Sequence, residues 1–173
     1  MRFDPAVWRE RAWNRLCKFP SRRGVESRWA AEIVAIHDLD VLVEWCAAKG
    51  LEVAFGKKQN GVYDPSNKRI TISSSALPGR QLAYLLHEAG HHLIGESEHH
   101  ERFAMGYPRD EDPQVRRKFK HKLACLEEEL EAWHRGWRLA RRLALAINRD
   151  AFDEVREDCI RSYVKWAAKR GDL

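Results

Sequence analysis

The segment His87-Glu88-Ala89-Gly90-His91 constrains this 173-residue chain more than any other feature of its sequence. It lies in a predicted helix that begins after Pro78-Gly79, runs to about Gly95 and carries a stripe of apolar residues. Side chains at positions i and i+4 of a helix share a side, so His87 and His91 can bind one zinc ion together. Glu88 lies about 100° around the helix, where it misses the ion but reaches a water molecule beside it. The pattern therefore predicts two metal ligands and a general base.

The third zinc ligand has to come from another part of the chain, because a catalytic zinc site has three protein ligands and one open position. A metzincin has glycine and histidine at the positions of Ile94 and Ser97, so these two residues exclude that class. We expect the ligand to be Glu131, in the next long helical segment, because the small side chain of Ala132 lets two helices pack closely. The alternatives, in order, are Glu128 and then His99 or His100.

Glu131 belongs to an acidic cluster. One carboxylate of this cluster can bind the ion while a neighbour forms a hydrogen bond to a ligating histidine. The rest are expected on a solvent-exposed face that pairs with Arg135 and its neighbours, and Glu129 is assigned to that face. The cluster consists of Glu127, Glu128, Glu129 and Glu131.

The pattern around these motifs predicts an α+β fold that is mostly helical, with a small three-stranded antiparallel sheet packed on the HEXXH helix. We expect strands at 51–55, 62–63 and 69–73, and helices from Asp4-Pro5 to before Pro20, over 25–49, over 113–147 and over 151–169. A polar loop is expected over 96–112. The whole chain, 1–173, is predicted to be one domain with its core at about 51–140.

Composition and charge restrict the partners. No apolar run reaches the roughly 18–20 residues needed to cross a bilayer, and no secretory signal is evident, so we expect a cytoplasmic protein without a membrane partner. The four cysteines form no C-x-x-C pair, which excludes a cysteine-based zinc knuckle. The net charge is +5, and the segment Gln114–Arg149 carries ten Lys or Arg against four Glu. An alternative function is therefore a non-catalytic zinc-binding regulatory or nucleic-acid-binding protein.

From about Leu51 to Ala140, the chain resembles the minigluzincin peptidases, and among them the ImmA/IrrE type. Gly90 matches the glycine of that family's H-E-x-G-H helix, and Glu131-Ala132 is similar to its Glu-Ala ligand motif, although Trp133 stands where the family usually has Asn or Asp. The resemblance implies a zinc metallopeptidase acting on a protein or peptide substrate. That substrate is expected to be a transcriptional regulator, in a phage or mobile-element setting.

The residues then suggest a mechanism. Glu88 would take a proton from water and pass it to the leaving amine. The predicted strand at 69–73 would pair with an extended substrate. An oxyanion donor is also needed, and its candidates are Tyr107, Tyr163, His99 and His134. The substrate-binding strand consists of Arg69, Ile70, Thr71, Ile72 and Ser73.

Overall fold

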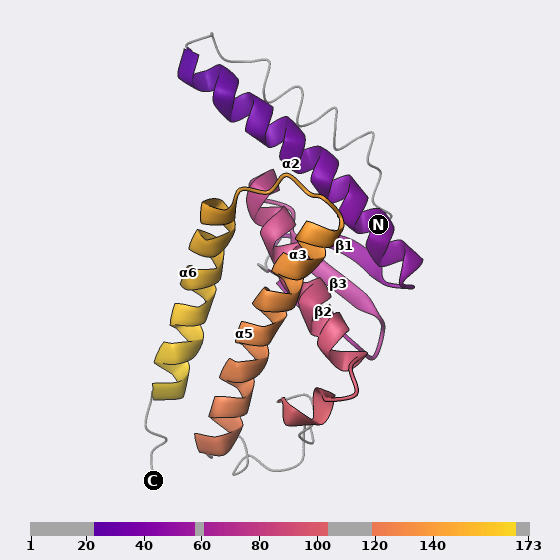
Figure 1. Cartoon of the computed structure of the whole chain (residues 1–173), viewed down its shortest axis with the longest axis vertical. Helices are drawn as coiled ribbons and strands as arrows, with labels where there is room; N and C mark the ends of the chain where they lie inside the picture. The colour runs from indigo at the N-terminus through magenta and orange to yellow at the C-terminus, as the bar shows by residue number, and fades with distance from the viewer. Residues whose placement is uncertain (1–22, 58–60, 104–118, 169–173) are drawn as a thin grey trace.

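The computed structural model describes residues 23–57, 61–103 and 119–168 (Figure 1). The predicted helix after Asp4-Pro5 and the predicted helix start at Asp112-Pro113 lie outside these ranges. The described elements confirm the predicted α+β class. In chain order they are α2 (Arg23–Ala48), β1 (Glu52–Gly56), β2 (Gly61–Asp64), β3 (Arg69–Ser73), α3 (Pro78–Gly95), the 3-10 helix η1 (His100–Arg102), α5 (Phe119–Arg142) and α6 (Arg149–Ala168).

The sheet is mixed, so the prediction of an antiparallel sheet is only partly right. Its strand order is β1-β3-β2, with β3 antiparallel to β2 and parallel to β1. Strand β3 takes the centre because it carries Ile70 and Ile72, both 0% exposed, and a central strand offers the most burial. The consecutive strands β1 and β2 therefore lie on opposite edges of the sheet.

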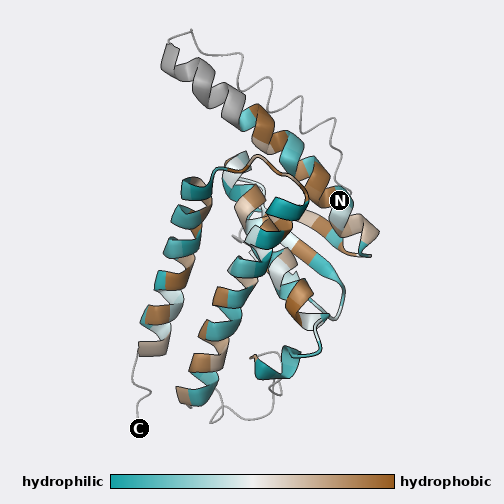
Figure 2. Cartoon of the chain, in the orientation of Figure 1, coloured by the Kyte–Doolittle hydropathy of each residue, from teal (hydrophilic) through white to brown (hydrophobic). Residues whose placement is uncertain are grey.

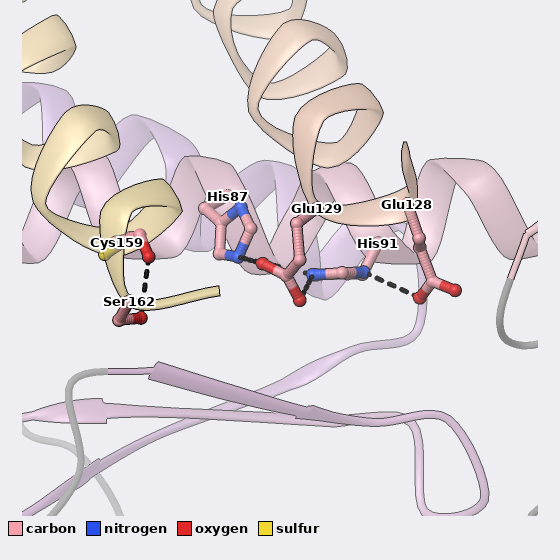
Figure 3. A network of polar contacts seen from close by, with 6 residues as sticks. All are labelled: His87, His91, Glu128, Glu129, Cys159 and Ser162. Atoms are coloured by element: carbon pink, nitrogen blue, oxygen red, sulfur yellow. Dashed lines mark hydrogen bonds and ion pairs between the residues drawn. The ribbon is translucent and has the colours of Figure 1, made fainter. Parts of the chain in front are cut away.

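Helix α3 lies between the sheet and α5 (Figures 1 and 3). All its residues from Gln81 to Gly90 are buried, because α3 packs against the sheet, α2 and α5. The side-chain amide of Gln81 donates a hydrogen bond to the backbone oxygen of Ser73 at 2.8 Å. This bond joins the first turns of α3 to the end of β3.

Helices α3 and α5 cross with their backbones almost in contact. A Cβ atom added to Gly90 of α3 would collide with the backbone carbonyl of Ala132 in α5. A Cβ atom added to Gly136 of α5 would lie 2.5 Å from the backbone oxygen of Leu86 in α3. The expectation that a small residue at 132 allows close packing is consistent with this crossing. Two glycines, one on each helix, make it possible.

Helix α2 covers the core with its C-terminal half. Ile33, nearer the start of the helix, is 50% exposed. The buried side chains are Leu39, Leu42 and Cys46, where α2 packs against α3 (Figures 1 and 2). None of the helices in the described ranges combines the length and apolarity that a bilayer crossing requires.

Helix α5 ends five residues before the predicted boundary at Ile147. The backbone of Ala144 is left-handed (φ 53°), and the N–H of Leu145 donates to the oxygen of Ala140 at 3.0 Å, which closes the helix. Helix α6 begins at Arg149 rather than Ala151, because the side chain of Asn148 caps it. The Asn148 oxygen accepts a hydrogen bond from the N–H of Ala151 at 3.0 Å.

Candidate metal centre

Two histidines of α3 and one glutamate of α5 bring their donor atoms together inside the protein (Figure 3). The Nε2 atoms of His87 and His91 are 3.2 Å apart. The carboxylate of Glu129 lies between them, with one oxygen 3.1 Å from Nε2 of His87 and the other 3.5 Å from Nε2 of His91. This buried cluster of His87, His91 and Glu129 can hold a metal ion.

The two imidazole nitrogens have the spacing of neighbouring ligands around a tetrahedral ion. When zinc binds nitrogen and oxygen at about 2.0–2.1 Å, neighbouring ligand atoms in a tetrahedron lie about 3.3 Å apart. The two Nε2 atoms are 3.2 Å apart, close to that value, while Nε2 of His87 lies 3.1 Å from Oε2 of Glu129 and Nε2 of His91 lies 3.5 Å from Oε1. Two imidazoles and a carboxylate also form a donor set that zinc uses in hydrolytic sites. The residues present therefore fit a zinc ion.

The structure brings Glu129, and not the predicted Glu131, to the two histidines. Glu131 points to the other side of α5, where it accepts a hydrogen bond from Nε of Arg135 at 2.7 Å and lies 3.5 Å from Arg138. The assignment of Glu129 to a solvent-exposed face is wrong, since this residue is 8% exposed.

The close crossing of α3 and α5 explains this difference. Ala132 and Gly136 both face α3, and Glu129 precedes them by three and seven residues, which places it on the same side of the helix. Glu131 lies about 100° around the helix from Ala132. Sequence reasoning used Ala132 only as a neighbour of Glu131. The signal it missed was the i, i+3, i+7 spacing of Glu129, Ala132 and Gly136.

Glu128 does not join the cluster but orients one of its ligands. Its carboxylate is 3.1 Å from Nδ1 of His91, the ring nitrogen that faces away from His87. Burial disfavours the charged form of His91, but the carboxylates of Glu128 and Glu129 outweigh it and raise the pKa of His91 to about 10. Burial alone would raise the pKa of Glu129. Hydrogen bonds from the two histidines outweigh burial and hold that pKa well below its ordinary value.

His87 is oriented by an aromatic ring. Its imidazole stacks on the indole of Trp133 with the ring centres 4.3 Å apart and the planes inclined by 18°. Within the described part of the chain, Nδ1 of His87 has no hydrogen-bond partner. Trp133 is 1% exposed and contacts Phe152 of α6 edge to face. Packing therefore does for His87 what the carboxylate of Glu128 does for His91.

Glu88 belongs to α3, and its side chain points toward Gly61 of the edge strand β2. It is not one of the three clustered donors. Burial raises the pKa of its carboxyl group, while the charges of His87 and His91 and a hydrogen bond from the backbone of Tyr63 oppose that rise. A Cβ atom on Gly61 would lie 2.6 Å from Oε1 of Glu88. Gly61 therefore leaves the space that this carboxylate fills.

The prediction that the strand at 69–73 pairs with the substrate is wrong, because this strand has no free edge. Both edges of β3 are already paired, one with β1 and the other with β2, so Arg69–Ser73 has no open edge for another chain. The strand beside Glu88 is β2, which has only one partner strand among the described residues. The hydroxyl of Tyr63 in β2 also lies 3.1 Å from Nδ1 of His92 in α3.

The remaining candidates separate clearly. Tyr163 of α6 forms a hydrogen bond with Glu129, and burial together with that carboxylate raises the pKa of the tyrosine. His99 and His100 are exposed beyond the end of α3, and His134 is exposed and lies 3.5 Å from Glu131, so none of the three joins the metal cluster. Tyr107 lies outside the described residues.

Comparisons with family models, with curated proteins and with solved structures find no match for this chain.

Proposed function

We propose that this protein is a zinc-dependent metallopeptidase of the gluzincin type that hydrolyses peptide bonds in a protein substrate. The observation that carries the proposal is the buried cluster of donor atoms from His87, His91 and Glu129. The buried carboxylate of Glu88 beside them adds to it, because a purely structural zinc site has four protein ligands and needs no adjacent base.

The residues divide the work of hydrolysis between them. A zinc ion in this cluster would make a bound water more acidic and would polarise the scissile carbonyl. Glu88 takes the proton of the attacking water and passes it to the leaving amine, a role that its raised pKa favours. Tyr163 is the candidate oxyanion donor whose hydroxyl reaches the cluster, where it contacts Glu129. Glu128 and Trp133 keep the two imidazoles in place.

The substrate would bind as an extended strand along β2. A substrate segment that added a strand alongside Gly61–Asp64 would bring one of its peptide bonds next to Glu88. This replaces the role first expected for Arg69–Ser73. By its resemblance to the ImmA/IrrE type, we further propose that the substrate is a transcriptional regulator in the cytoplasm, in a phage or mobile-element setting.

Metal analysis combined with cleavage assays tests this function. The purified wild type should contain one zinc per chain and should cut a peptide library prepared from a bacterial proteome, read out as new peptide termini. Glu88→Gln should keep zinc and lose cleavage by about 100-fold or more. Glu129→Ala should lose both, whereas Glu131→Ala, its matched neighbour, should keep both.

Two results would reject the peptidase. One is a wild type that holds zinc and cuts nothing, and the other is cleavage that survives in Glu88→Gln. Zinc retained by Glu129→Ala but lost from Glu131→Ala would restore the ligand first expected from the sequence.

The nucleic-acid alternative is weaker, because acidic residues neutralise part of the basic charge that suggested it. Glu131 lies within ion-pair distance of Arg135 and Arg138, and Asp153 within that of Arg149 and Arg156. Binding to DNA with a steep salt dependence, in a protein without cleavage, would support this alternative instead.

A further inference from the structure

A groove of about 600 Å³ runs between α5 and α6, and none of its lining residues belongs to the metal cluster. The two helices lie side by side and run in opposite directions (Figure 1). Figure 2 shows hydrophilic and hydrophobic residues alternating along both of them. The apolar lining residues extend for about 10 Å along α5 and about 18 Å along α6, at 1.5 Å per residue. They are Leu130, Trp133, Trp137, Phe152, Ile160 and Val164.

The floor of the groove is a packed aromatic cluster. Phe152 contacts both tryptophans, with ring centres 5.3 Å from Trp133 and 5.3 Å from Trp137. The walls are open at the surface, since Leu130 and Val164 are each 47% exposed. Large apolar side chains that stay exposed above an aromatic floor are typical of a surface that a partner covers.

The rim of the groove is basic. Arg149, Arg156 and Arg161 line it against a single acidic residue, Glu157. Asp153, which lies within ion-pair distance of Arg149 and Arg156, offsets part of this charge but leaves the rim with an excess of arginine. The guanidinium of Arg149 lies 4.4 Å from the ring centre of Trp137, so charged and apolar surfaces meet directly.

We propose that this groove binds the apolar face of an acidic amphipathic helix from a partner protein. An elongated apolar surface between two helices accepts a third helix whose apolar residues recur at i, i+3, i+4 and i+7. The basic rim selects acidic residues on the flanks of that helix. The basic rim also argues against a second copy of this chain, because a two-fold dimer through this groove would bring together two rims that each carry an excess of arginine. The proposal stands apart from the peptidase, since it uses no metal ligand.

A labelled helical peptide of about three turns tests this groove directly. The acidic probe carries leucine at i, i+3, i+4 and i+7 with glutamate elsewhere, and its matched control replaces every glutamate by lysine. Fluorescence anisotropy with the full chain should show the acidic peptide binding about tenfold or more tighter than the basic one. Arg161→Glu should reduce or reverse that preference.

Substitutions of exposed groove residues locate the binding. Leu130→Glu and Val164→Glu should each weaken the acidic peptide by about tenfold or more. Ile33→Glu, on α2 and equally exposed, should bind like wild type. Far-UV circular dichroism and zinc content should stay unchanged in all three, which separates this test from that of the peptidase.

Several outcomes would overturn the proposal. They are binding of neither peptide, equal binding of both, and wild-type binding by Leu130→Glu. A concentration-dependent dimer in sedimentation that Leu130→Glu abolishes would assign the groove to a second copy and would also overturn it.

Discussion

At the scale of single residues, the position of the Glu88 carboxylate depends on the lack of a side chain at Gly61, which lies beside it in the fold. Gly61 is the first residue of β2. Because it has no side chain, the Glu88 carboxylate has room beside the backbone of Tyr63. A glycine within a strand often marks such a close approach. The position of the proposed base is therefore set as much by β2 as by α3.

We predict that Gly61→Ala impairs cleavage without removing zinc. The new Cβ would lie 2.6 Å from Oε1 and 3.1 Å from Cγ of Glu88, so the carboxylate has to move. A base displaced by about 1 Å is expected to cost about 100-fold in kcat/KM. Steady-state kinetics and zinc analysis check this. Unchanged kinetics would show that Glu88 does not act from its observed position.

The metal-free protein should lose stability as the pH rises. Glu128 and Glu129 raise the pKa of His91 from 6.5 to about 10, so its protonated form is stabilised by folding. The stabilising contribution is fully present below about pH 6.5 and disappears as the pH approaches 10, with a slope of at most about 1.4 kcal/mol per pH unit for one proton. Urea unfolding of the chelated protein at several pH values measures it.

The affinity for zinc should change in the opposite direction over the same interval. The proton on Nε2 of His91 has to leave before that nitrogen can bind an ion, so affinity rises with pH. Glu128→Gln should flatten the stability slope, because it removes one of the two carboxylates that raise this pKa. A metal-free protein that is as stable at pH 9 as at pH 7 would contradict both expectations.

How far the residues could be predicted depends on what positions them. His87 and His91 lie one helical turn apart, and their meeting follows from helix geometry alone, which the sequence shows. Glu129 comes from another helix, and its position depends on how α5 is rotated against α3. That rotation was encoded in Ala132 and Gly136, two small residues whose spacing was not used. The role of Glu88 as a base stays a prediction.

At the scale of elements, the contact between α3 and α5 determines the metal centre. Each helix contributes a glycine where the other's backbone approaches, Gly90 from α3 and Gly136 from α5. The ligands lie within one turn of Gly90 on α3 and within two turns of Gly136 on α5. Any increase in the spacing between these helices therefore separates Glu129 from the two histidines.

Gly136→Ala should destabilise the protein and release its metal. The added methyl would lie 2.5 Å from the backbone oxygen of Leu86, and no rotamer change can relieve a clash with backbone. We expect a loss of about 3 kcal/mol or more in the free energy of unfolding, together with weaker zinc binding. Thermal melts and zinc titrations measure the two effects.

Gly79→Ala provides the matched control on α3. A Cβ there meets no atom within 4 Å, so this change should leave stability unchanged or raise it by about 0.5–1 kcal/mol. Equal effects of the two substitutions would show that the close crossing does not limit the fold.

The elements themselves were partly predictable. Local patterns placed β3 and the end of α3 where they are observed, and the start of α3 two residues late, because alternation and helical periodicity are local signals. The order of strands is not local, and the burial of Ile70 and Ile72 in the centre of the sheet decided it. The end of α5 also escaped prediction, since it depends on Ala144, whose left-handed backbone the sequence gives no reason to expect.

At the scale of the whole molecule, distant parts of the chain are held together at polar contacts inside the protein. The buried carboxylate of Asp38 in α2 accepts a hydrogen bond from the backbone N–H of Ala146 at 2.7 Å, in the connection between α5 and α6. The metal cluster likewise joins α3 to α5. Since an unfolded chain cannot assemble that cluster, an ion that binds it stabilises the folded state.

Removal of zinc should therefore lower the melting temperature. At a free zinc concentration of about 1,000 times Kd, the ion would add about 4 kcal/mol to the free energy of unfolding. Differential scanning calorimetry with and without a chelator measures the shift. Glu129→Ala should melt at the same temperature in both conditions, and a wild type that also shows no shift would argue against metal binding at this cluster.

A single aromatic ring, that of Trp133, lies between the metal cluster and the groove of α5 and α6. One face of the indole touches His87, and the same side chain lines the groove between α5 and α6. A ligand that shifted Trp133 on binding in the groove would also shift the ring that packs on His87. Thermodynamic linkage then requires that a ligand in the groove and a metal ion in the cluster change each other's affinity by the same factor. Binding in the groove and binding of a metal ion would then be coupled through Trp133.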